Sequence, residues 1–65
     1  MKIGDQVKIV AKEDELKYIC EYSRTIILNK PYGTIYHLYK DAAEVSCGLA
    51  GIHEFKLNQL KLKEK

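Results

Sequence analysis

The most reactive side chains in the sequence are two cysteines and two histidines, at Cys20, Cys47, His37 and His53. No two of them have the roughly two-to-four-residue spacing with which one turn grips a metal ion. A thiolate nucleophile and a histidine base would have to be assembled across a hairpin, from Cys47 and either histidine. The sequence has no phosphate-binding glycine loop and no nucleophile elbow. We therefore expect no metal site, no cofactor and no enzymatic activity.

The N-terminal residues and the hydropathy of the chain predict the cellular compartment, and with it the redox state of the two thiols. The first residues become charged too soon for the apolar centre of a signal peptide, and no apolar run approaches the roughly 18 to 20 residues that span a bilayer. We therefore expect a cytoplasmic protein with no membrane partner. In that compartment Cys20 and Cys47 are expected to be reduced, buried thiols rather than a disulfide.

The aromatic residues favour a binding surface. Of the six aromatic residues, five are tyrosines, and all five precede residue 40. Tyrosine offers wide contact area at low entropic cost and is enriched at protein interfaces. The predicted protein-binding residues are four tyrosine anchors and three acidic steering charges: Tyr18, Tyr22, Tyr32, Tyr36, Glu13, Asp14 and Glu15.

The basic residues support a second hypothesis. Eleven Lys and Arg against nine Asp and Glu give a net charge of +2, which is a weak signal for nucleic acid. The residues that would contact phosphates are Arg24, Lys30, Lys56, Lys61 and Lys63. Lysines that alternate with leucines near the C-terminus also protect an edge strand from pairing with another chain.

The elements that must position these residues are mainly strands. A chain of 65 residues supports one thin core, so residues 1–65 are taken as a single domain. Alternating apolar residues predict strands over 3–10, 33–39, 43–47, 52–57 and 61–63. The middle three form a meander of hairpins, and the last strand is expected to pair near the first. The predicted core is Val7, Ile9, Ile35, Val45, Phe55, Leu57 and Leu60, with Gly33 at a position where a Cβ would not fit.

Residues 11–29 form a long excursion between the first and second strands. Leu16, Ile19 and Cys20 recur at helical spacing, with Asp14 placed to cap one or two helical turns. Residues 23–28 stay undecided, because Thr25 and its β-branched neighbours favour a strand while their spacing continues a helix.

The chain resembles the SH3-like barrel superfamily, and among its members the small bacterial or phage proteins with a KOW-like frame. The segments that carry the resemblance are Gly4-Asp5-x-Val7-x-Ile9, Gly33-x-Ile35, the strand at Val45, and Phe55-x-Leu57-x-x-Leu60-x-Leu62. The resemblance implies a mainly β, five-stranded SH3-like barrel whose long first loop can contain a short helix. A KOW-like relationship further implies a module that binds nucleic acid or the ribosome.

These observations lead to two hypotheses about function. The first is a noncatalytic interaction module, an accessory protein of a phage or mobile element that binds another protein as a monomer or weak homodimer. The alternative is a KOW-like module that binds nucleic acid or associates with the ribosome.

Overall fold

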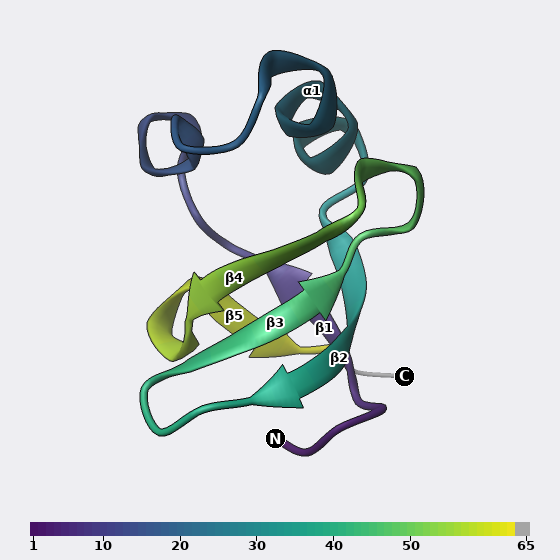
Figure 1. Cartoon of the computed structure of the whole chain (residues 1–65), viewed down its shortest axis with the longest axis vertical. Helices are drawn as coiled ribbons and strands as arrows, with labels where there is room; N and C mark the ends of the chain where they lie inside the picture. Colours follow the sequence, from purple (N-terminus) through teal and green to yellow (C-terminus); the bar gives the residue numbers. More distant parts are fainter. Residues whose placement is uncertain (64–65) are drawn as a thin grey trace.

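The computed structural model describes residues 1–63 and contains one five-stranded antiparallel sheet with short helical segments around it (Figure 1). The strands are β1 (Gln6–Ile9), β2 (Tyr32–Leu38), β3 (Ala42–Ser46), β4 (Ile52–Lys56) and β5 (Leu60–Leu62). The helix is α1 (Glu21–Asn29), and the 3-10 turns are η1 (Glu13–Leu16), η2 (Gly48–Ala50) and η3 (Leu57–Gln59). The chain is thus mainly β, as predicted.

The strands follow the order β4-β3-β2-β1-β5. The meander of β2, β3 and β4 is confirmed, and so is the pairing of the last strand with the first, with Val7 opposite Leu62. The sheet curls, so that β1 and β5 lie behind β3 and β4 in the view of Figure 1. Within residues 1–63 the strands β4 and β5 form the two edges and do not pair with each other, so the sheet is not closed.

Alternation along the strands builds the core. In β1, Val7 and Ile9 are buried while Gln6 and Lys8 are exposed, as a strand with one face on a core requires. Six of the seven predicted core residues are buried, and Phe55 is the largest of them. Leu57 is the exception. It begins η3 instead of continuing β4, and it is only partly buried against the core.

Gly33 has the close backbone contact that the sequence predicts. A Cβ built on it would lie 2.5 Å from Cγ1 of Val45 and 2.7 Å from the carbonyl oxygen of Ser46. The β2 strand begins at Tyr32, one residue before the predicted start, and Gly33 pairs with Val7. The missing side chain therefore lets β2 and β3 approach each other.

The long excursion contains more helix than the pattern predicts. Residues 23–28, undecided from sequence, belong to α1, whose inward side chains are Ser23 and Ile27. The helix packs against η2, which connects β3 to β4. Burial of Ile27 in the core outweighs the intrinsic strand preference of the β-branched run.

The turns η1 and η3 are stabilised by the same kind of hydrogen bond, from a backbone N–H to a side chain three residues further along. The side chain of Glu15 accepts a hydrogen bond from the Lys12 backbone N–H at 2.9 Å, and Gln59 accepts one from the Lys56 N–H at the same distance. The prediction that Asp14 caps this turn is therefore wrong, since the capping acceptor is Glu15. The Gln59 amide also donates to Glu15 at 3.3 Å, which joins η1 to η3.

The longest helix among residues 1–63, α1, has nine residues, and none of the described helices could span a bilayer.

Candidate functional site

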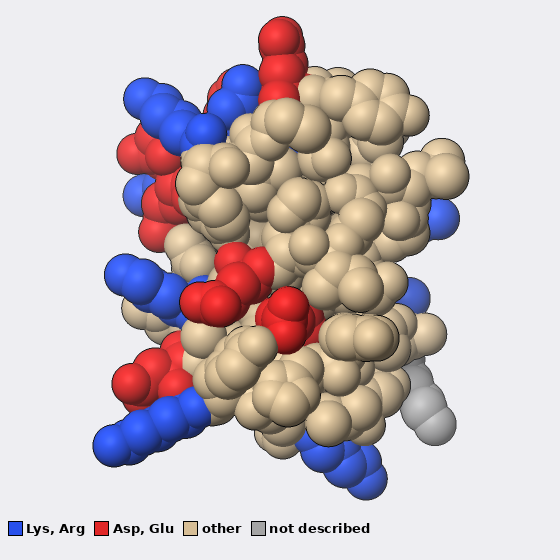
Figure 2. Space-filling model, viewed as in Figure 1, with Lys and Arg blue, Asp and Glu red and all other residues tan. Residues whose placement is uncertain are grey.

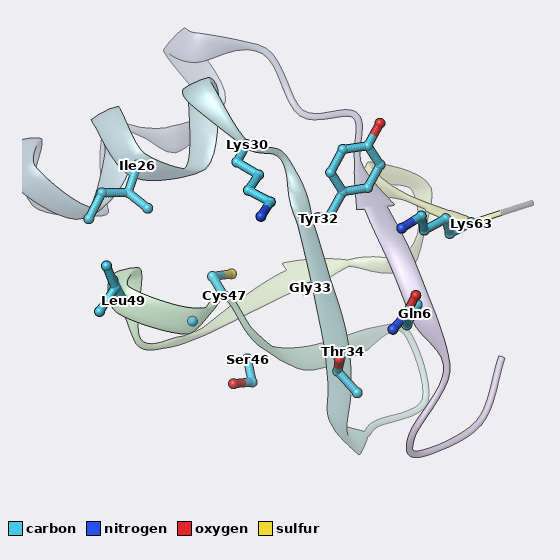
Figure 3. A pocket seen from close by; sticks show the side chains of 11 residues that line it. Gln6, Ile26, Lys30, Tyr32, Gly33, Thr34, Ser46, Cys47, Leu49 and Lys63 are labelled. Carbon is cyan, nitrogen blue, oxygen red and sulfur yellow. The ribbon is translucent and has the colours of Figure 1, made fainter.

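A groove of about 450 Å³ runs along the outer face of β2 (Figure 3). Its walls come from β1, β2, β3, η2, the end of α1 and the residue after β5. The lining residues are Gln6, Ile26, Lys30, Tyr32, Gly33, Thr34, Ser46, Cys47, Gly48, Leu49 and Lys63. It therefore joins segments from both ends of the chain.

A smaller depression of about 230 Å³ adjoins this groove. It is lined by Lys8, Tyr32, Lys61, Leu62 and Lys63, so it shares Tyr32 and Lys63 with the groove. The Nζ atom of Lys63 lies 5.1 Å from the centre of the Tyr32 ring, which is cation–π distance. No aspartate or glutamate of the described residues lines either hollow.

We call the surface formed by Lys8, Lys30, Tyr32, Lys61 and Lys63 the lysine face. Sheet register brings most of it together, because Lys8 pairs with Tyr32 on one side and with Lys61 on the other. Residues directly opposite each other on neighbouring strands share a face. The side chains of Lys61, Lys8 and Tyr32 therefore form one row across β5, β1 and β2.

A second row lies two residues along the same strands. Gln6 pairs with Thr34, and Thr34 pairs with Ser46, which places three neutral hydrogen-bonding side chains across β1, β2 and β3. We call these three residues the neutral row. Beyond Ser46 the groove ends at Ile26 of α1 and Leu49 of η2, and Leu49 is 88% exposed. Figure 3 shows these two apolar side chains at the end opposite Lys63.

The predicted tyrosine anchors do not share one hollow. Of the four, the groove contains only Tyr32. Tyr18 follows η1 and uses its hydroxyl to donate a hydrogen bond to the Glu54 carbonyl at 2.6 Å. Tyr22 is on α1 and is 70% exposed, and Tyr36 lies at the bulge in β2.

The predicted acidic steering charges are mixed with basic ones. Glu13 and Asp14 line a depression together with Lys12, Lys17 and Arg24. Figure 2 shows both signs of charge side by side at the position of η1. The hydrogen bond from the Lys12 N–H lowers the pKa of Glu15, and the Glu15 carboxylate serves as the acceptor that stabilises the turn η1. Local charges of both signs partly cancel, which weakens long-range steering.

The predicted phosphate contacts divide between three places. Lys30, Lys61 and Lys63 belong to the lysine face, whereas Arg24 lies in the mixed depression on the helical side. Lys56 lines a hollow that also contains Asp41 and Glu54. Lys8 and the neutral row were not predicted from the sequence. The alternation of the first strand could have indicated Gln6 and Lys8, because both flank the buried Val7 and so share the exposed face of the strand.

The two thiols are free and differ in exposure. Cys47 is buried at the base of the groove, and burial raises the pKa of its thiol to about 11. Cys20 is exposed at the start of α1, so the expectation that both thiols are buried is wrong for this residue. Its hydrogen bond with Ser23 lowers the pKa of the Cys20 thiol. Across residues 1–63 no cluster of three or more His, Cys, Asp and Glu is arranged to hold a metal ion.

No family model, curated protein or solved structure matches this chain, so the function of the groove is inferred from its own residues.

Proposed function

We propose that this chain is a noncatalytic binding module of the SH3-like barrel type whose lysine face binds nucleic acid. The proposed fold family is supported by the strand order, with a meander of β2, β3 and β4 and a last strand that returns to pair with β1. The 3-10 turn η3 (Leu57–Gln59) separates β4 from β5. The extra helix α1 occupies the first loop, where the resemblance allows one.

The observation that carries the proposal is the separation of charge. The net charge of the whole chain is only +2, yet the two hollows around Tyr32 have four lysines in their lining and no carboxylate from the described residues. Lysines that neutralise phosphates release condensed counterions, which supplies nearly all of the affinity in non-specific nucleic-acid binding and a large share in specific binding. An exposed tyrosine ring beside them can stack on a base.

Titration of the protein against a fluorescent single-stranded oligonucleotide at several salt concentrations tests this proposal. The double variant Lys8→Gln/Lys61→Gln should bind more weakly to every sequence. Its log–log salt slope should fall by about 0.7 for each phosphate that the variant no longer neutralises. Lys40→Gln is the matched control, since Lys40 is exposed and lines neither hollow. Absence of binding at low salt, or equal behaviour of the double variant and the control, would reject the proposal.

A protein partner is the second candidate. It is favoured by exposed apolar and aromatic side chains on the helical side, above all Tyr22 and Leu49. Capture from a bacterial lysate with and without nuclease separates the two functions. A protein retained after nuclease treatment, and lost with Tyr22→Ala but not with Lys61→Gln, would support this candidate. Its loss on nuclease treatment would support nucleic acid.

A further inference from the structure

We propose that the neutral row of Gln6, Thr34 and Ser46 contacts the edges of unpaired bases, so that the groove selects single-stranded nucleic acid and distinguishes between bases. This inference rests on the proposed function and assigns different contacts to two neighbouring parts of the binding surface. The lysines contact phosphates, and the neutral row contacts bases.

The chemistry of the neutral row suits a base edge. One amide and two hydroxyl groups both donate and accept hydrogen bonds, whereas lysine only donates. Among residues 1–63 none of these three side chains forms a hydrogen bond with another residue. Their donors and acceptors are therefore open to a ligand in the groove.

The walls of the groove suit an unstacked base. Tyr32 is two residues from Thr34 on the same face of β2, and its side chain is 40% exposed. A base that replaces the Lys63 ammonium on this ring would have its edge beside the neutral row. Ile26 and Leu49 give an apolar wall at the far end. Sequence-specific RNA recognition uses this combination of stacking and edge contacts on unpaired bases.

Charge complementarity selects the occupant. A strand of nucleic acid carries a phosphate beside each base, and the row of Lys61, Lys8 and Tyr32 runs alongside the neutral row at a distance of two residues along β1 and β2. Phosphates and bases can thus contact the two rows at the same time. An acidic peptide would satisfy the lysines but has no repeated planar ring for Tyr32.

The test compares labelled single-stranded oligonucleotides of uniform base, about twelve nucleotides long, with a duplex of the same length. The wild-type protein should bind single strands more tightly than the duplex and should rank oligo-U, oligo-A and oligo-C differently. Thr34→Val removes one hydroxyl at nearly constant shape. It should change the affinity ratio between these sequences by about 2- to 10-fold, as expected for one hydrogen bond.

Several controls separate base contacts from charge and from folding. Thr34→Ser should restore the wild-type ranking because it restores the hydroxyl, and Gln6→Ala should alter the ranking as Thr34→Val does. Thr25→Val makes the same chemical change on the exposed side of α1 and should leave the ranking unchanged. The salt slope should be the same in all four variants, since none removes a lysine.

Three outcomes would overturn the inference. They are a duplex bound as tightly as single strands, an equal loss on every sequence with Thr34→Val, and displacement of the oligonucleotide by polyglutamate at matched charge. Each leaves the proposed function in place as long as the Lys8→Gln/Lys61→Gln variant still weakens nucleic-acid binding. Failure of the wild-type protein to bind any nucleic acid would reject both.

Discussion

The hydroxyl of Tyr18 donates a hydrogen bond to the backbone carbonyl of Glu54, 2.6 Å away and 36 positions further along the chain. Glu54 is in β4, an edge of the sheet, and an edge strand presents unpaired backbone groups that can pair with another chain. Tyr18 satisfies one of these groups. The long excursion therefore holds the far edge of the sheet as well as contributing a helix.

Removal of that hydroxyl tests its contribution to stability. Tyr18→Phe should lower the free energy of unfolding by about 0.5 to 1.5 kcal/mol, the usual net value of a hydrogen bond. Tyr22→Phe is the control, because that side chain is highly exposed on α1. Urea denaturation of the three proteins gives the comparison. Equal midpoints for the wild type and Tyr18→Phe would show that the bond adds nothing in solution.

Gly33→Ala should destabilise the sheet by about 1 to 3 kcal/mol or more, as expected when an atom is forced into a packed site. The added methyl group would meet Val45 and the backbone of Ser46, and backbone cannot move aside as a flexible side chain can. Gly48→Asn offers a contrast, since Gly48 has a φ of +65° and open space, and asparagine tolerates that conformation. Thermal unfolding should rank Gly33→Ala well below Gly48→Asn.

Glu15 makes stability depend on pH. Its pKa is lowered from 4.5, first by the hydrogen bond from Lys12 and then by that from Gln59. The unfolded state therefore binds a proton more readily than the folded state, so the stabilisation is fully present above about pH 4.5 and is lost as the pH falls through the folded pKa. Glu15→Ala should lower the urea midpoint at neutral pH and have less effect in acid. The same loss at both pH values would contradict this assignment, and Glu13→Ala serves as the control.

The two cysteines should react at very different rates. Thiolate is the reactive form, so Cys20, exposed and with a lowered pKa, should be alkylated by iodoacetamide in the native protein at neutral pH. Cys47, buried and with a pKa of about 11, should react only after unfolding in urea. Peptide mass spectrometry distinguishes the two sites. Native labelling of Cys47 at the rate of Cys20 would show that the base of the groove opens readily.

The strands were predictable because their signals are local. Alternation identifies β3 and β4, and Lys30-Pro31 marks the end of the excursion before β2. Residues 23–28 stayed open between helix and strand, because their helical spacing and their β-branched side chains favour different elements. The packing of α1 against η2, an element further along the chain, favours the helix, and no local pattern reveals that contact. The start of η3 at Leu57 accompanies the hydrogen bond from the Lys56 backbone N–H to the Gln59 side chain, a local contact that the alternating pattern does not indicate.

The candidate site was predictable only in part. Lys30, Tyr32 and Lys63 were selected by residue type, but under two different hypotheses. Their proximity depends on register, since Tyr32 faces Lys8 and the Lys63 backbone N–H donates to the Gln6 carbonyl at 3.0 Å. A shift of one residue in either pair would send alternate side chains to the opposite face. The alternation in a sequence predicts which residues of one strand share a face, but it does not predict which residues of the neighbouring strand lie opposite them.

The pairing of β1 with β5 has a consequence for biosynthesis. Val7 leaves the ribosome well before its partner Leu62, which is 55 positions later in the chain. Until residues 60–62 have emerged from the exit tunnel, one side of β1 has no partner, and closing so long a loop is entropically costly. The finished sheet is thus completed after synthesis of its last strand, and a nascent chain halted in η3 would present β1 to chaperones as an open edge.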